Sequence, residues 1–300
     1  MKLFISKFHG WLALWLMAAL FVTGNTAAAA ADKITINVNG QSVSFPDMQP
    51  TRVEGRVLVP LRQVLEAMGA EVKWNNKSQS AVATLNQSTV EIMLDSRYIQ
   101  ASNGTDSSQV VQLDIPAILL EGRTMIPLRA SGELLGFSVS WDEATLTADL
   151  KSGGPSSEPA LSFPHYPLQG DIKQLHEEEL DAFFLTNSVR ERHKAGIPLG
   201  LHVELSQVAR EKSKDMSDKD YFDHSSPTYG SPFDMMKSFG ISFNAAGENI
   251  AMGYPTPEEV VTGWEHSPGH LSNIVSENFA YIGVGYIEGS NVFWTQMFTD

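Results

Sequence analysis

The sequence predicts an α+β protein, in which a β-rich duplicated N-terminal domain with short helices precedes a C-terminal α-β-α sandwich. Residues 33–150 repeat one short pattern of strand, helix and strand at a constant offset, which indicates two copies of one structural unit. Residues 171–300 instead show helical periodicity first and two strand-like apolar runs last, an order typical of a layered domain of helices and sheet. The length of 300 residues also fits about two domains.

Residues 1–31 predict a secretory signal peptide. Lys2 and Lys7 precede an apolar core at 11–22, and small residues follow at 27–31, which is the order of a cleavable leader. The apolar core is too short for a comfortable membrane span. We therefore expect a secreted, extracellular protein that has no transmembrane anchor after cleavage, with association to the cell wall as a further expectation.

The charge and the cysteine count narrow the range of partners. The formal net charge is −14, and the chain has no cysteine. Nucleic acid is not expected as a partner, because its phosphates require clustered Lys and Arg. Without cysteine the chain has neither disulfides nor a site for lipid attachment. The expected partner is a cell-envelope component, with a lipid or a peptide as the unidentified ligand.

The internal repeat is clearest at one motif. Residues 55–62 read GRVLVPLR, and residues 122–129 read GRTMIPLR. In each copy an apolar strand meets a proline, which suits the start of a helix, and a glycine then caps the helix end. The expected elements are helices at 61–68 and 128–135, each followed by a strand that leads to Trp74 or Trp141.

On this motif, residues 32–150 resemble the copper amine oxidase N-terminal-like domain, a tandem unit of many secreted bacterial proteins. The family name does not imply copper here, because the segment contains no His and no Cys and so lacks the good copper ligands. Arg62 and Arg129 invite a ligand-binding role. We instead expect them to pair with Glu66 and Glu133, at the spacing that brings side chains together on a helix face.

Residues 151–170 are rich in proline, glycine and serine, which predicts an extended linker with solvated side chains. In the C-terminal domain, 171–300, the second helix has an apolar stripe that includes one charged residue, Lys212. The stretch 246–251 is expected to lead into a loop, and 223–227 to form a polar turn. The expected elements are helices at 175–195, at 204–221, from Ser231-Pro232 to Gly240 and from Pro257 to about Ser267, and strands at 281–287 and 291–298 joined by a hairpin.

Motifs in this domain resemble the CAP superfamily, which comprises cysteine-rich secretory proteins, antigen 5, plant pathogenesis-related proteins and their bacterial SCP-like relatives. The resemblance implies an α-β-α sandwich with a long cleft. The motifs, which follow the family's order, are Asn187–Arg190, Phe222–Ser225, Gly247–Ile250, Trp264–His270, Ser272–Ile274, Gly283–Gly285 and Trp294–Phe298.

The resemblance also implies a cleft cluster of two His and two Glu, which in some members holds a divalent metal. By motif, three of its members here are His224, Glu248 and His270. Animal and plant members carry Glu at the fourth position, where this sequence has Ser267, as many bacterial relatives do. Glu265 lies toward the opposite side of the helix, so it is only a weak candidate.

Two imidazoles, one carboxylate and an open water position form a plausible zinc set. If a metal-bound water reacted, Glu248 would be the candidate catalytic base. The alternative is a polar cluster that hydrogen-bonds across the cleft or contacts a ligand.

Three functions follow from these observations. The leading hypothesis is a secreted, cell-envelope-associated binding module that is not an enzyme and whose cleft holds a divalent metal, zinc before others. The competing hypothesis is a metal-dependent extracellular hydrolase of the peptidase kind. The third is an adhesion or scaffold protein that works through the N-terminal repeats.

Overall fold

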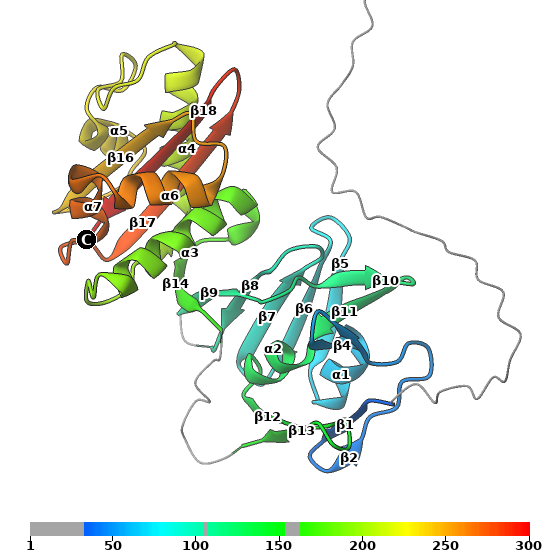
Figure 1. Ribbon diagram of the computed structural model, residues 1–300. Coiled ribbons are helices and arrows are strands. Elements are labelled where there is room, and N and C mark those ends of the chain that lie inside the picture. Colours follow the sequence, from blue (N-terminus) through cyan, green and yellow to red (C-terminus); the bar gives the residue numbers. More distant parts are fainter. Residues whose placement is uncertain (1–32, 105–106, 154–162) are drawn as a thin grey trace, which may run out of the picture. The chain divides into compact units, whose positions relative to one another are not determined.

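A computed structural model describes residues 33–104, 107–153 and 163–300 (Figure 1). The predicted signal peptide therefore lies outside the described residues. The chain divides into two compact units, Met1–Lys33 and Ile34–Asp300, and the second holds all the described helices and strands. In the described ranges, no helix is both long enough and apolar enough to cross a membrane.

The two copies of the repeat meet along a pair of antiparallel strands. Strand β4 (Arg56–Pro60) pairs with β11 (Arg123–Pro127), and Val59 lies opposite Ile126. The other strands of this part are β1 (Thr35–Val38), β2 (Gln41–Ser42), β3 (Thr51–Val53), β5 (Glu71–Asn75), β6 (Ser80–Leu85), β7 (Ser88–Met93), β8 (Tyr98–Ser102), β9 (Ser108–Gln112), β10 (Ile118–Leu120), β12 (Phe137–Asp142) and β13 (Thr147–Ser152). Each copy thus contributes its motif strand to the same small sheet, of order β10-β11-β4-β3.

The predicted repeat helices are confirmed. Helix α1 (Leu61–Ala67) follows Pro60 and helix α2 (Leu128–Glu133) follows Pro127. The expected ion pairs are also present, with Arg62 Nη1 at 3.1 Å from Glu66 Oε1 and Arg129 Nε at 4.0 Å from Glu133 Oε1. Exposed pairs of this kind stabilise a helix only slightly, so these arginines are accounted for without a ligand.

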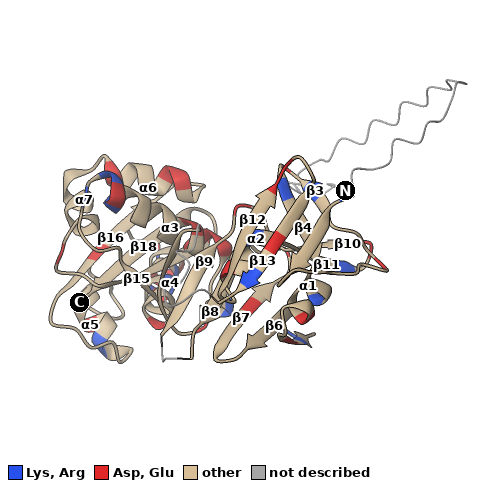
Figure 2. Cartoon of the chain, turned by 90° about the horizontal axis from the view of Figure 1, so that it is seen from below, with Lys and Arg blue, Asp and Glu red and all other residues tan. Residues whose placement is uncertain are grey.

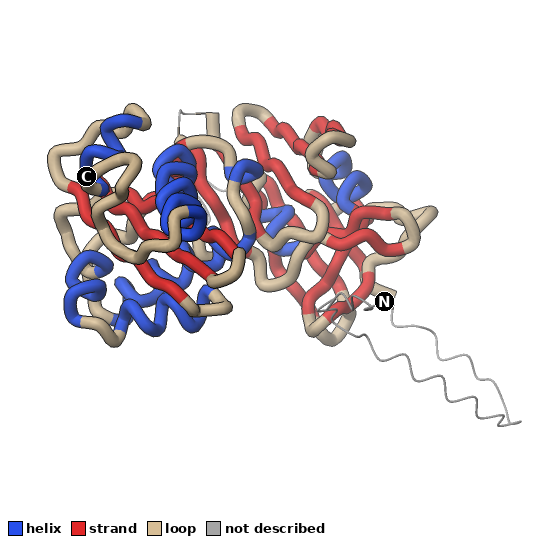
Figure 3. The backbone as a smooth tube through the Cα atoms, turned by 90° about the horizontal axis from the view of Figure 1, so that it is seen from above, coloured by secondary structure: helices blue, strands red, loops and turns tan. Residues whose placement is uncertain are grey.

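The C-terminal part, 163–300, is a three-layer α-β-α arrangement (Figures 1 and 3). Its central strands run in the order β16-β18-β17-β15-β14. Helices α4 and α5 lie on one face, and α3, α6 and α7 on the other. The elements are β14 (His165–Gln169), a 3-10 turn at Ile172–Gln174, α3 (Glu177–Arg192), β15 (Gly200–His202), α4 (Val203–Asp218), α5 (Pro232–Ser238), β16 (Ala246–Met252), α6 (Pro257–Glu265), α7 (Pro268–Ile274), β17 (Tyr281–Glu288) and β18 (Val292–Thr299).

Alternation along β17 separates the two faces. Ile282 and Val284 belong to the core that contains the α3 and α6 side chains. Gly283 and Gly285, between and after them, face α4, and a Cβ on either would lie within 2.4 Å of the α4 backbone. The helix therefore packs directly on the strand backbone, which fixes its distance from the sheet.

The predicted linker at 151–170 is partly wrong. Residues 165–169 form strand β14, which pairs antiparallel with β9 and parallel with β15. Tyr166 is half-buried, and its ring contacts those of Phe183 and Phe184. Residues 154–162 of the predicted linker lie outside the described residues. Residues 165–169 are extended, as composition suggested, but strand pairing and these aromatic contacts give them a fixed place.

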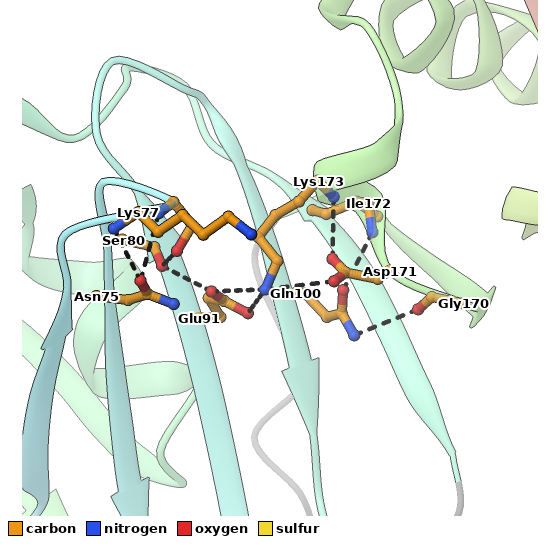
Figure 4. A network of polar contacts seen from close by, with 10 residues as sticks. Asn75, Lys77, Ser80, Glu91, Gln100, Gly170, Asp171, Ile172 and Lys173 are labelled. Atoms are coloured by element: carbon orange, nitrogen blue, oxygen red, sulfur yellow. Dashed lines mark hydrogen bonds and ion pairs between the residues drawn. The ribbon is translucent and has the colours of Figure 1, made fainter.

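Strand β14 joins the sheet of the C-terminal part to that of the repeats. The resulting ten-stranded sheet ends at β16 on one side and at β5 on the other. Around the junction, Lys173 Nζ lies 2.8 Å from Glu91 Oε2, and Gln100 contacts the backbone of Gly170 and Ile172 (Figure 4). Tyr98 of β8 is fully buried within the C-terminal core.

Two regular elements near the predicted site were not among those expected. Residues 246–251 do lead into a loop, at 253–256, but they themselves belong to strand β16. Pro268 and Gly269 were expected to stop a helix. They do follow the end of α6, but Pro268 also begins α7, since proline is well suited to the first turn of a helix.

Adding a methyl group at Gly285 is expected to separate α4 from the sheet. A Cβ there would lie 2.0 Å from Arg210 N and 2.1 Å from Ala209 C, and helix backbone cannot move aside as a flexible side chain can. We expect Gly285→Ala to lower the free energy of unfolding by about 3 kcal/mol or more, measured by urea denaturation. Gly269→Ala is the matched control, because no atom lies within 4 Å of its added methyl; equal stability of the two variants would contradict the packing argument.

Candidate functional site

The site is organised by alternation along β16. Glu248 faces the α4 side, as does Ile250, which packs with Met216 of α4. Asn249 and Ala251 face the opposite side, where α6 and α7 lie. Successive residues of a strand point to opposite faces, so one short strand presents polar groups to both layers.

His224 is delivered by a tight loop after α4. Within residues 221–230, the backbone N–H of Ser225 donates to Asp223 Oδ1 at 2.7 Å, and Ser226 and Gly230 exchange two backbone hydrogen bonds. The buried carboxylate of Asp215, on α4, accepts from the hydroxyls of Ser226 and Thr228, both at 2.6 Å. The predicted polar turn is thus present, and it is closed on itself and anchored to the helix.

His224 and Glu248 form a dyad, the name used below for this pair. His224 Nδ1 lies 2.6 Å from Glu248 Oε1; the imidazole side chain is 55% exposed, whereas the carboxylate side chain is 2% exposed. The hydrogen bond to Glu248 raises the pKa of His224, against the opposing effect of burial. The second carboxylate oxygen, Oε2, is buried and has no hydrogen-bond partner among the described residues.

His270 belongs to α7, a helix that is attached to the other face of the edge strand through its backbone. The backbone carbonyl of His270 accepts from Asn249 Nδ2 at 3.1 Å. Partial burial lowers the pKa of the half-buried His270 imidazole, and the charge of His224 lowers it further, which places the two imidazoles within electrostatic reach. Two of the three predicted side chains are therefore in direct contact, and the third flanks them.

Two asparagines, Asn249 and Asn273, hold α7 on β16. Both belong to the family motifs, but the sequence assigned them no role. Asn273 Nδ2 donates to the backbone carbonyl of Glu248 at 3.1 Å and to Asn249 Oδ1 at 2.8 Å. Asn249 also donates to Gln296 Oε1 at 3.0 Å. The signal in the sequence was a fully polar residue within the apolar run of β16, because a buried amide needs hydrogen-bond partners.

Among the described residues, neither weak candidate hydrogen-bonds to the dyad. The Glu265 carboxylate binds α3, with Arg192 Nη2 at 2.6 Å and His193 Nε2 at 2.9 Å. Ser267 is the half-buried residue before α7, and its side chain makes no capping hydrogen bond. Glu265 therefore ties α6 to α3, as its position on the opposite side of the helix suggested.

A divalent metal fits these residues only in part. The unpartnered Oε2 of Glu248 is the kind of oxygen that a cation would take. Across the described ranges, however, no three His, Asp or Glu side chains converge closely enough to hold a metal ion. The predicted zinc set therefore stays a prediction, and no chemical step is derived from it.

Comparison with known proteins identifies both parts. Residues 37–150 match the copper amine oxidase N-terminal domain family, and residues 183–298 match the cysteine-rich secretory protein family, CAP. An uncharacterized protein YkwD of Bacillus subtilis is 62% identical over 115 residues, which are 38% of this chain and 44% of that protein. A protease inhibitor of Brevibacillus choshinensis is 30% identical over 149 residues, 45% of this chain and 41% of that protein. This chain thus spans less than half the length of these curated relatives.

Solved structures resemble the chain more distantly. An extracellular protein containing an SCP domain from Bacillus anthracis is 19% identical, with a TM-score of 0.39, and covers 86% of this chain and 78% of its own. A cysteine-rich secretory protein from Staphylococcus aureus is 11% identical, with a TM-score of 0.36, and covers 89% of this chain and 98% of its own. The sequence families and the three-layer arrangement agree: residues 183–298 are a CAP domain, and residues 37–150 before it are a copper amine oxidase N-terminal domain.

Proposed function

We propose that this protein is a secreted binding module of the cell envelope, and that its CAP domain contacts its ligand through the His224–Glu248 dyad. The observation that carries the proposal is the unpartnered, buried Oε2 of Glu248 beside an exposed imidazole. A buried carboxylate oxygen without a donor costs free energy. A ligand group that donates to it would recover that free energy, which favours binding at this place.

The surroundings of the dyad indicate the chemistry of the ligand. The group that meets Glu248 must donate a hydrogen bond or carry positive charge, because an ionised carboxylate only accepts. Phe222, two residues before His224, is 47% exposed and offers an apolar surface. A peptide, with N–H donors and apolar side chains, satisfies both requirements, and the peptide stems of the cell wall are such a ligand in the envelope.

Export to the envelope is supported by two observations. The first residues have the composition of a signal peptide. The family model that matches residues 183–298 is described as the cysteine-rich secretory protein family. Figure 2 shows Lys and Arg scattered among Asp and Glu in that view, and with a net charge of −14 this pattern supports a partner other than nucleic acid.

Binding, rather than hydrolysis, is the conclusion for two reasons. The carboxylate of Glu248 is 2% exposed and contacts His224, an arrangement that suits a fixed hydrogen-bonding partner for a ligand. One relative is named a protease inhibitor, a role that needs binding to a protein but no turnover. The hydrolase alternative predicts peptide cleavage that stops on Glu248→Gln; observing it would overturn the binding proposal.

A titration with soluble peptide fragments of the cell wall tests the proposal. The readout is the imidazole signals of His224 in ¹H–¹⁵N spectra of the full mature chain. We expect saturable shifts in the wild type, and binding weakened at least about tenfold in Glu248→Gln, since a hydrogen bond to a charged group contributes about 1.5–3 kcal/mol. Glu265→Gln is the matched control and should bind as the wild type does. Absence of saturable shifts in the wild type would contradict the proposal.

A divalent cation is the second candidate occupant, favoured by the same free oxygen. Calorimetric titration with zinc should show one site in the wild type, lost in His224→Ala and in Glu248→Gln, because both side chains are ligands that zinc prefers. His270→Ala should weaken binding if His270 is recruited as a third ligand. The same negligible heat in all four proteins would contradict a zinc site. Peptide binding is tested separately by the titration described above.

The dyad also predicts a pH dependence of stability. Glu248 raises the pKa of folded His224 above its ordinary value, so the stabilisation is fully present below the unfolded pKa, about 6.5. It is lost as pH rises through the folded pKa. We therefore expect the stability advantage of the wild type over His224→Gln to be greatest below about pH 6.5 and to shrink toward alkaline pH, in urea denaturation. The same comparison made in a Glu248→Gln background should show no such trend, and a trend that persists there would contradict the assignment to this pair.

A further inference from the structure

Behind the loop that carries His224, helix α4 contains a lysine with no exposed surface. Lys212 is 0% exposed, and its Nζ donates to the backbone carbonyl of Asp223 at 2.7 Å and to that of His224 at 2.8 Å. A third contact, at 3.3 Å, reaches the Tyr221 hydroxyl, and the ammonium lies 5.0 Å from the centre of that ring. All three donors of the ammonium are therefore directed at one short segment, 221–224.

The burial of this ammonium is costly and needs an explanation. Among the described residues, no carboxylate lies within ion-pair distance of Lys212. Its charge is balanced from further away by Glu248, Asp215 and Asp223. A methionine of similar length would fill the same apolar stripe of α4 without the cost of desolvating a charge. The polar end of the side chain must therefore contribute something that packing does not.

The neighbouring residue Asp215 indicates what the polar end of Lys212 contributes, because it also hydrogen-bonds to the loop. Asp215, one turn further along α4, fixes the second half of the loop through the hydroxyls of Ser226 and Thr228. Lys212 fixes the first half through carbonyl groups. Because one helix face supplies both an acceptor for hydroxyls and a donor for carbonyls, the loop is held at both ends. Of the two, Lys212 is the one that hydrogen-bonds to the backbone of His224 itself.

We propose that Lys212 is a positioning residue for the dyad: its ammonium fixes the backbone of Asp223 and His224, and thereby holds the imidazole against Glu248. The ammonium acts through the loop backbone and does not touch the ligand. The relevance of this role to binding rests on the proposed function, but the role itself is measurable in the free protein.

Amide hydrogen exchange in the free, full mature chain is the first test. We expect Lys212→Met to speed exchange of the Ser225 and Ser226 amides at least about tenfold, because hydrogen bonds to a charged group are lost. The hydrogen-bonded Nδ1–H signal of His224, recorded at a pH where the ring is protonated, should broaden or disappear. Exchange in the centre of α4 should stay as in the wild type, since methionine fills the same space. Unchanged loop exchange and an unchanged Nδ1–H signal would overturn the proposal.

Chemical rescue separates the charge from the volume of the side chain. In Lys212→Ala, n-propylammonium should restore slow exchange of the Ser225 amide, whereas n-propanol, which fills a similar volume without the charge, should not. Rescue by both compounds, or by neither in a protein that remains folded, would contradict a role for the ammonium. Lys214→Met is the matched surface control, because Lys214 is exposed and pairs only with Asp218 among the described residues; it should change nothing in the loop.

The outcome is independent of ligand binding. Fast loop exchange in Lys212→Met together with no peptide binding by the wild type would support the positioning role and remove the proposed function. Slow loop exchange in Lys212→Met, together with peptide binding by the wild type, would remove the positioning role and support the proposed function.

Discussion

The close approach of α4 to β17 is the constraint on which the site depends. Gly283 and Gly285 leave the strand without side chains on that face, so the helix backbone rests directly on the strand. This contact fixes the position of α4, and with it the polar groups at the ends of the Lys212 and Asp215 side chains. Those groups hydrogen-bond to the loop 221–230 and so fix its position. The position of an exposed imidazole therefore depends on the absence of two side chains from a strand that packs against the helix carrying its anchors.

A second constraint is the charge of Glu248. Its carboxylate is almost wholly removed from water, one oxygen contacts His224, and the other has no partner in the described part of the chain. Desolvation of an anion is costly unless positive charge lies nearby. Lys212 supplies positive charge at longer range, which offsets part of the cost of burying the carboxylate. The same lysine thus has two effects: it hydrogen-bonds to the loop that carries His224, and its charge acts on Glu248 of β16.

The sequence predicted much of this organisation. The elements that it did not predict include two strands, β14 and β16, that pair with strands distant in the chain. Local signals were sufficient for the repeat helices after Pro60 and Pro127, for the capped start of α6, and for the hairpin of β17 and β18. The family motif located the partner residues His224 and Glu248. Strand β16 was not predicted, because a glycine and polar residues interrupt its apolar pattern. The alternation that sends Glu248 and Asn249 to opposite faces was therefore not predicted either. Pairing between distant strands, as in β14, leaves no local signal.

The position of the site at the edge of the sheet follows from these constraints. Strand β16 pairs with β18 on one side and is the last strand on the other among the described residues. The dyad lies on the α4 face of this edge, and α7 is attached to the other face, where the backbone carbonyl of His270 accepts from Asn249. Partial burial lowers the pKa of the His270 imidazole and the charge of His224 lowers it further, so the two imidazoles lie within electrostatic reach of each other at this edge. A ligand that follows the edge of the sheet would therefore meet groups supplied by both layers of helices.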